Sequence, residues 1–195
     1  MGRQKLYNRN DALASIKRCF WRTGYAATSL HDLEQATGLP KQTLYREFSS
    51  KEGMYIAALA SYDREEVESA IRLLHQHDLP NLRFAALFDS LLETAETPAG
   101  RDGCFLCNAA ADRTGIERIV SDAVSASLTR LRDAFAAALN ASATDDHFAD
   151  SLLATYVGFR SLIRNHWPME KLRAVADETL FQIEKHQERK NQLGR

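Results

Sequence analysis

The chain has 195 residues and a mass of 21.9 kDa, with 45% hydrophobic and 26% charged residues. This balance is typical of a globular protein built as one compact unit or two small ones, and no apolar run reaches the ~18–20 residues of a membrane span. The chain begins without a signal-peptide core and its three cysteines are too few for a disulfide framework, so we expect a cytoplasmic protein.

The formal net charge of −1 hides an uneven distribution along the chain. Residues 1–55 carry nine Lys and Arg against five Asp and Glu, whereas residues 56–195 carry 16 against 21. The first part therefore has a net charge of +4 and the second a net charge of −5. A basic first part favours nucleic-acid binding by one end only, although a solvated charge imbalance explains the numbers equally well without a DNA-reading motif.

The first predicted helix covers residues 10–23, where apolar residues recur on one face and Gly24 follows the last turn. A second, short helix follows, for which Thr28 or Ser29 is the expected N-cap. Asp32 stands three residues after Ser29, which is the spacing of a capping box.

A glycine turn separates this helix from a third. Gly38 supplies the turn and Pro40 occupies the position where a new helix can start. Leu44 and Phe48 lie four residues apart and point inward, so polar and cationic side chains of the third helix point outward. Two short helices joined by a glycine turn describe a helix-turn-helix DNA reader.

The rest of the chain predicts six further helices and no strand longer than a few residues, so the expected fold is all-α with about nine helices. Their ranges are 50–75, 81–96, 104–113, 116–139, 147–165 and 169–190. Asp78, Leu79 and Pro80 end the long helix that begins near residue 50.

The last two predicted helices carry apolar residues on more than one face, more than a surface helix needs. The residues concerned are Tyr156, Phe159, Ile163, Leu172, Val175, Leu180 and Ile183. Either these are two core helices of a monomer, or they form a four-helix bundle with their copies in a two-fold dimer, where Gly158 would permit close approach.

The run GYAATSLHDLEQATGLPKQTLYREFSSKEGMY, residues 24–55, resembles the N-terminal domain of TetR-type transcriptional regulators. The resemblance rests on the T-S before the second helix, the A-T-G turn, the T-L-Y of the third helix and the F-S-S-K-E that follows. It implies a DNA-binding head at residues 1–52, a ligand-binding and dimerisation body at residues 53–195, and a homodimer through the last two helices. We expect no cofactor.

The resemblance also implies DNA contacts residue by residue. Lys41, Gln42 and Thr43 open the helix that reads base edges, while Tyr45 and Lys51 match residues that contact the DNA backbone. The full predicted set is Thr28, His31, Lys41, Gln42, Thr43, Tyr45, Arg46 and Lys51. Gln pairs with adenine and Lys with guanine, and the Thr methyl can touch thymine.

Four further charged residues near this surface have open interpretations. Glu47 either turns aside or accepts a hydrogen bond from cytosine N4. The N-terminal basic residues Arg3, Lys5 and Arg9 either touch the DNA or form a disordered arm.

The body offers a set of apolar residues that form either an ordinary core or, as the resemblance implies, part of a pocket for an apolar or amphipathic effector. The set comprises Phe84, Leu87, Phe88, Leu91, Cys104, Phe105 and Phe135. The sequence places no charged residue among this apolar set, so it does not identify the ligand.

The segment Gly103 to Asn108 has the pattern G-C-x-L-x-N, which resembles a TetR subgroup that contains the N-ethylmaleimide reductase repressor, an electrophile sensor. Cys104 opens a helix near Arg101, where a thiol can have a lowered pKa, and Cys107 lies three residues later. Cys104 and Cys107 are thus candidates for redox sensing, although simple packing, a metal site and redox catalysis also fit.

Three functions follow from these features. The first is a ligand-responsive transcriptional regulator, a repressor that binds a near-palindromic DNA operator as a dimer. The others are a dithiol enzyme based on Cys104 and Cys107, and a helical interaction module with a vestigial helix-turn-helix. We expect no enzyme, because the chain carries no Ser/His/Asp set, phosphate loop or paired-carboxylate motif.

Overall fold

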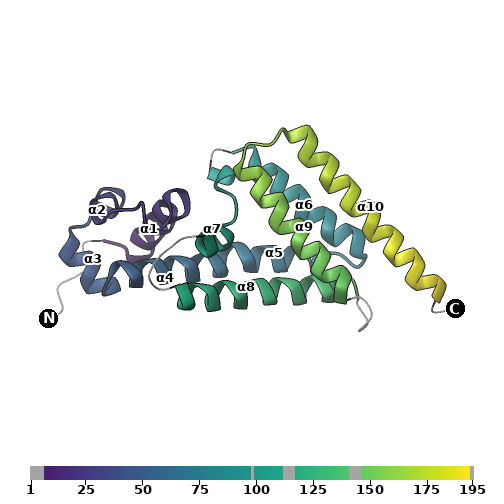
Figure 1. Ribbon diagram of the computed structural model, residues 1–195, viewed down its shortest axis with the longest axis horizontal. Helices are drawn as coiled ribbons and strands as arrows, with labels where there is room; N and C mark the ends of the chain where they lie inside the picture. The colour runs from purple at the N-terminus through teal and green to yellow at the C-terminus, as the bar shows by residue number, and fades with distance from the viewer. Residues whose placement is uncertain (1–6, 98, 112–116, 141–145, 194–195) are drawn as a thin grey trace. The chain divides into compact units, whose positions relative to one another are not determined.

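The computed structural model describes residues 7–97, 99–111, 117–140 and 146–193, and within these ranges the chain is helical and has no strands (Figure 1). The α-helices are α1 (Arg9–Thr23), α2 (Leu30–Thr37), α3 (Lys41–Phe48), α4 (Lys51–Tyr62), α5 (Glu68–Leu73), α6 (Pro80–Ala95), α7 (Phe105–Ala111), α8 (Glu117–Ala138), α9 (Asp146–Arg164) and α10 (Met169–Leu193). A π-helical turn, η1 (Asp63–Val67), joins α4 to α5, and a 3₁₀ turn, η2 (Ala99–Asp102), precedes α7. Counting α4, η1 and α5 as one continuous run, the described residues contain the nine helices that the sequence predicts.

Backbone contacts divide the chain into two compact units. The first comprises residues 1–66 and 105–125, and the second comprises residues 67–104 and 126–195. These units differ from the expected division after residue 52, because α4 packs on α1 with a face that includes Tyr55, Ala58 and Tyr62. The first unit is therefore larger than a three-helix head.

Aromatic side chains form the centre of the first unit. Phe105 of α7 is fully buried and packs edge-on against Tyr55 and Tyr62 of α4, with ring centroids 5.7 and 5.9 Å apart. Phe20 of α1 meets Tyr55 at 5.0 Å in the same geometry, and Trp21 meets Tyr62 at 4.9 Å. Such edge-to-face pairs add to the hydrophobic burial of large rings, so α1, α4 and α7 form one core.

The first unit also buries one cation. Lys17 of α1 is 7% exposed and its ammonium forms an ion pair with Glu65 of η1, whose carboxylate also accepts a hydrogen bond from Ser61 Oγ at 2.6 Å. A buried charge needs such partners, because desolvation otherwise disfavours it strongly.

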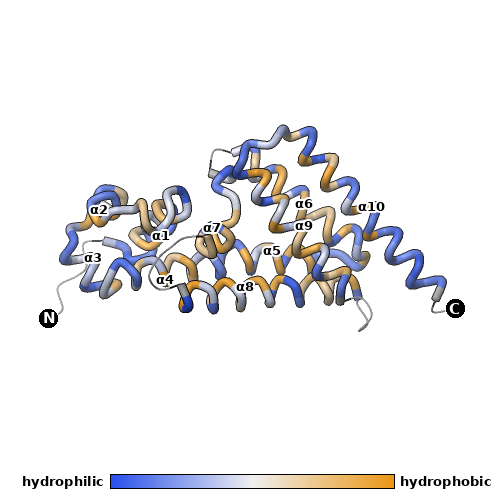
Figure 2. Tube along the Cα trace, in the orientation of Figure 1, coloured by the Kyte–Doolittle hydropathy of each residue, from blue (hydrophilic) through white to orange (hydrophobic). Residues whose placement is uncertain are grey.

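The core of the second unit lies between α6, α8 and α9. Phe135 of α8 packs edge-on against Phe84 of α6 and Tyr156 of α9, with ring centroids 5.5 and 5.8 Å apart. Phe88 and Phe159 form a similar pair at 5.3 Å. Figure 2 shows apolar residues along much of α9, whereas the last turns of α10 are hydrophilic.

Basic and polar side chains cap the C-terminal end of α8. Arg83 of α6 donates to the carbonyl oxygen of Ala138 at 2.9 Å. On α10, the side chain of Gln187 donates to the carbonyl of Leu139 and that of Lys190 to the carbonyl of Asn140. These bonds satisfy carbonyls that a helix end leaves without intrahelical partners, and cations are favoured there by the helix dipole. None of the helices in the described ranges is long and apolar enough to cross a membrane.

Candidate DNA-recognition surface

The capping box predicted at the start of α2 is present, with Ser29 as the N-cap. Its Oγ accepts a hydrogen bond from the backbone N–H of Asp32 at 3.1 Å, and the Asp32 carboxylate accepts from the Ser29 N–H at 2.7 Å. The hydrogen bond from the Ser29 hydroxyl, followed by that from its backbone, lowers the pKa of Asp32. The capping box thereby satisfies two of the N–H donors that the start of α2 leaves without an intrahelical partner.

The turn between α2 and α3 requires a residue with a left-handed backbone conformation. Gly38 has φ +66° and its N–H donates to the Glu34 carbonyl at 2.8 Å, which is the geometry of a helix C-cap. A Cβ at Gly38 would meet no atom within 4 Å, so the backbone conformation rather than crowding explains the glycine. This turn sets the direction in which α3 leaves α2.

A side chain of α2 caps α3 across the turn. Pro40, the N-cap residue, has no side-chain acceptor, and the Glu34 carboxylate instead accepts the backbone N–H of Lys41 at 2.5 Å. Sequence reasoning missed this contact, because Glu34 lies seven residues before Lys41 and only the folded turn brings them together. The bond ties the first turn of α3 to α2.

The outward face of α3 carries the side chains that sequence analysis placed there. Leu44 and Phe48 are buried, whereas Lys41, Gln42, Tyr45 and Arg46 are exposed. Thr43 is half-buried on the flank, and His31 is exposed on α2, 3.0 Å from the Gln35 amide. The face therefore offers cationic, amide and phenol groups, which can bond to base edges and phosphates.

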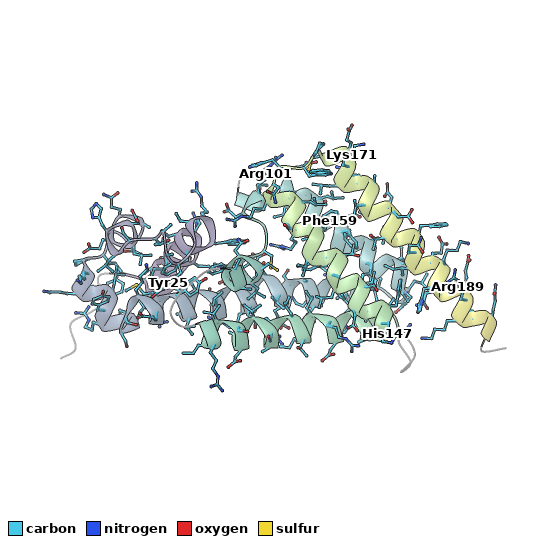
Figure 3. The ribbon with its side chains drawn as sticks, viewed as in Figure 1. Tyr25, Arg101, His147, Phe159, Lys171 and Arg189 are labelled. Carbon is cyan, nitrogen blue, oxygen red and sulfur yellow. The ribbon has the colours of Figure 1, made fainter. Side chains whose placement is uncertain are left out.

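Two lysines of this surface lie over aromatic rings. The Lys41 ammonium lies 5.3 Å from the Tyr45 ring centroid, and the Lys51 ammonium lies 4.3 Å from that of Tyr25, which is labelled in Figure 3. Lys51 stands in the first turn of α4, where Ser50 Oγ accepts from the Gly53 N–H at 3.0 Å. Cation–π contacts restrict both side chains without neutralising their charge.

Glu47 is turned aside from the exposed face of α3. Its side chain is 9% exposed, and its carboxylate lies 3.8 Å from the Nε of both Arg9 and Arg46. The first of the two interpretations given above therefore holds. Arg9 also lies over the Phe48 ring at 4.8 Å, while Arg3 and Lys5 lie outside the described residues.

Thr28 is the one predicted contact that the structure removes from the surface. Its side chain is 1% exposed and its hydroxyl donates to the Gly24 carbonyl at 2.6 Å. The hydroxyl closes the turn between α1 and α2, so it does not face solvent. We drop Thr28 from the predicted set and keep the other seven residues.

The predicted effector set does not form one cluster. Phe84, Leu87, Phe88, Leu91 and Phe135 are all buried in the core of the second unit. Phe105, in contrast, belongs to the aromatic core of the first unit. In the sequence, Phe105 and the residues of the second unit show the same apolar pattern. That pattern does not reveal which of the two cores a short helix packs against.

Two arginines of α9 hold the segment that precedes Cys104. Arg160 is 7% exposed and donates to the Gly103 carbonyl at 2.6 Å, and Arg164 donates to the Asp102 carbonyl at 3.1 Å. Cys104 is buried and Cys107 is half-buried. The Arg101 guanidinium, expected near Cys104, instead donates to the Ala95 carbonyl and contacts His166 Nδ1, each at 3.1 Å.

The predicted dimer residues lie mostly inside the subunit's own core. Tyr156, Phe159, Ile163, Leu172 and Ile183 are all at most 5% exposed in the single chain, so they are not free to form an interface. Val175 and Leu180 are half-buried. The prediction took the inner faces of α9 and α10 for the outer ones, because both faces of α9 carry apolar residues.

Comparisons with known proteins match the part of the chain that carries this surface. The family model "Bacterial regulatory proteins, tetR family" matches residues 12–58, and the model "Tetracyclin repressor-like, C-terminal domain" matches residues 80–160. The chain is similar to the HTH-type transcriptional repressor ComR of Escherichia coli strain K12, with 38% identity over 111 residues. That match covers 55% of this chain and 51% of ComR, so it spans about half of the relative.

Solved structures extend the similarity over most of the chain. A cysteine variant of the TetR family regulator CifR, complexed with a 26-base-pair operator DNA, has a TM-score of 0.80 and 25% identity, covering 91% of this chain and 98% of that one. The reduced form of E. coli NemR has a TM-score of 0.77, with 88% and 94% covered. At 18% identity, the NemR match shows a common fold alone.

Proposed function

Because the chain belongs to the TetR family of bacterial regulatory proteins, we propose that it is a DNA-binding transcriptional repressor that acts as a homodimer and responds to an effector. The observation that carries this proposal is the exposed face of α3. Lys41, Gln42, Tyr45 and Arg46 project from a short helix that the Gly38 turn and the Glu34 carboxylate hold in place. A rigidly held polar helix is what reading of a major groove requires.

The contacts divide by chemistry into base readers and backbone anchors. Gln42 can donate and accept at one adenine edge, and Lys41 can donate to guanine. Tyr45 and Lys51 suit phosphates, because a phenol and an ammonium bond to them without distinguishing bases. The relative CifR was solved with its operator DNA, which supports DNA as the partner of this chain.

Selection of binding sites from random DNA tests this proposal. A dimer of helix-turn-helix heads should select two half-sites of opposite orientation, with centres separated by whole turns of about 10 base pairs. Recovery of no enriched sequence, or of single unpaired half-sites, would contradict the dimeric operator model. A variant with Glu34→Met should select the same sequence with lower affinity, because it removes the acceptor of the Lys41 N–H without changing the base-reading side chains.

We place the dimer interface on the outward faces of α9 and α10. Gly158 of α9 is exposed, and a Cβ there would meet no atom within 4 Å, while Val157 and Leu162 beside it are half-buried. Substitution Gly158→Glu should thus leave the single subunit intact and improve its helix propensity, but should place a charge in the interface. Sedimentation should show a folded monomer for this variant and a dimer for Ala137→Glu, an exposed control on α8. A dimer in both variants would exclude this face.

The effector site is proposed for the second unit. An apolar ligand could enter between α6, α8 and α9, where Phe84, Phe88, Phe135 and Phe159 pack edge-on. Alternatively, an electrophile could react at Cys104, as the resemblance of the Gly103–Asn108 segment to the N-ethylmaleimide reductase repressor subgroup suggests. In both cases the effector would favour a conformation with lower operator affinity.

Cysteine labelling separates these two kinds of effector. If the protein senses electrophiles, Cys104 should be alkylated faster than a free thiol at neutral pH, and its alkylation should reduce operator affinity. Burial raises the pKa of the Cys19 thiol, so Cys19 should react slowly. A slow Cys104, or unchanged operator affinity after its alkylation, would leave the apolar ligand as the effector.

A further inference from the structure

A pocket of about 450 Å³ opens between α1 and α2, within the first unit. It is lined by Ser15, Arg18, Cys19, Arg22, Thr23 and Ala36. None of these residues belongs to the predicted DNA contacts, to the aromatic core or to the effector set. The function proposed above therefore assigns no role to this pocket.

Two guanidinium groups form its cationic wall. Arg18 and Arg22 are exposed and stand four residues apart, so they project from the same face of α1. Within the part of the chain that the structure describes, neither forms an ion pair or a side-chain hydrogen bond with another residue. Like charges at this spacing destabilise a helix, so an anion between them would relieve an existing repulsion.

The remaining lining groups favour a polar anion. Ser15 and Thr23 bring hydroxyls, the latter donating to the Cys19 carbonyl at 2.8 Å, and none of the six residues carries a carboxylate. The negative charge of Asp32 on α2 contributes to the raised pKa of the Cys19 thiol. The Asp32 carboxylate, however, already accepts hydrogen bonds from the Ser29 hydroxyl and backbone N–H, at 2.6 and 2.7 Å. Because the Thr23 hydroxyl proton is already donated, the pocket is a cationic concavity in which Ser15 supplies the hydroxyl donor.

We propose that this pocket binds a small dianionic oxyanion, either as inorganic phosphate or as the phosphate group of a small metabolite. Two planar guanidinium groups match the oxygens of phosphate, and charge-assisted hydrogen bonds to such groups are strong. The volume of about 450 Å³ lies in the range of small-molecule sites and leaves space for an organic body beyond the phosphate group. The inference stands apart from the proposed DNA binding, because none of the six lining residues belongs to the predicted contact set.

Cys19 provides a built-in reporter of the occupied pocket. Its half-buried thiol lines the site, so a bound anion should hinder its alkylation by iodoacetamide, in which the thiolate sulfur displaces iodide. Labelling at about pH 8.5 offsets the raised pKa of this thiol, and peptide mass spectrometry reports each cysteine separately. Cys107, which is also half-buried but does not line the pocket, is the internal reference.

Phosphate and glycerol phosphate should each slow labelling of Cys19 relative to Cys107, compared with sodium chloride at equal ionic strength. At ten times its dissociation constant, either anion should reduce the rate about tenfold, and the anion with the lower midpoint identifies the natural form. Variant R18Q/R22Q should lose this protection. The control K171Q/R189Q, which removes two exposed lysine and arginine charges of α10 seen in Figure 3, should keep it.

Two results would overturn the proposal. The first is equal labelling of Cys19 in phosphate and chloride, or equal protection in the parent and R18Q/R22Q. The second is the absence of phosphate protection in the parent together with weaker DNA binding by R18Q/R22Q, whose salt slope is reduced by roughly two counterions. That result would show that both arginines contact phosphates of the DNA backbone. The labelling needs no DNA, so its failure is distinguishable from a failure of the proposed function.

Discussion

The buried Lys17–Glu65 pair predicts an asymmetric response to the loss of its two partners. The Lys17 side chain is 9% exposed, whereas that of Glu65 is 57% exposed. Substitution Glu65→Gln leaves the ammonium in a site that is largely closed to water. Substitution Lys17→Met removes the buried charge itself and keeps the apolar stem of the side chain.

The expected magnitudes follow from this difference in exposure. Removing one partner of a fully buried ion pair destabilises by about 3–5 kcal/mol, whereas a surface pair contributes about 0–1 kcal/mol. Because Glu65 faces water on one side, we expect Glu65→Gln to cost about 1–3 kcal/mol in the free energy of unfolding. Lys17→Met should cost less than about 1 kcal/mol, since apolar replacements of buried charges are often close to neutral.

Urea unfolding followed by tryptophan fluorescence measures the difference. Trp21 lies in the first unit, where it stacks near Phe105, and Trp167→Phe removes the only other tryptophan of the chain. All variants should be compared in this background at one protein concentration, because dimerisation would otherwise shift the midpoint. If Glu65→Gln is as stable as Lys17→Met at pH 7, or more stable, the described role of the pair is wrong.

The same pair predicts a pH dependence. Burial raises the pKa of Glu65, but the hydrogen bonds from Lys17 and Ser61 outweigh it and hold the pKa below its ordinary value. The folded-state pKa is thus lower than the unfolded one, so the stabilisation is complete above the unfolded pKa and is lost as the pH falls through the folded pKa. The advantage of the parent over Glu65→Gln should shrink below about pH 4. An advantage that is constant down to acid unfolding would contradict this direction.

Two further substitutions test the packing that positions the site. A Cβ at Gly53 would lie 2.0 Å from the Phe48 carbonyl oxygen, so Gly53→Ala should destabilise the first unit by more than about 2 kcal/mol in the same urea experiment. Arg83→Met removes the hydrogen bond to the Ala138 carbonyl and should cost about 1–2 kcal/mol in urea unfolding followed by circular dichroism, whereas Arg189→Met on α10 should be neutral. Equal stability of the two arginine variants would contradict the capping of α8.

Helix boundaries were predictable because local signals determine them. Gly24 and Gly38 end α1 and α2 with positive φ, as the sequence predicts, and α2 is capped by Ser29, one of the two predicted N-cap candidates. The burial of Leu44 and Phe48 likewise follows from their spacing on α3. The π-helical turn η1 was not among the predicted elements, because no residue type in Asp63–Val67 signals the change from i+4 to i+5 hydrogen bonding.

Contacts between elements were less predictable than the elements themselves. The burial of Thr28 and the bond from Lys41 to Glu34 both depend on how α2 turns against its neighbours. The inner face of α9 could not be told from its outer face, because residues on both are apolar. For the same reason, the sequence could not assign Phe105 to the core of the first unit.

Operator affinity of the Gln42→Ala variant tests the central claim most directly. A duplex recovered by selection and a scrambled duplex should be titrated by fluorescence anisotropy at one fixed salt concentration. The parent should prefer the selected duplex by about 10³-fold or more, and Gln42→Ala should lose about 1–3 kcal/mol on that duplex only. Gln76→Ala, an exposed residue after α5, should bind both duplexes like the parent. Equal binding of both duplexes by the parent, or unchanged preference in Gln42→Ala, would contradict recognition of DNA by the outward face of α3.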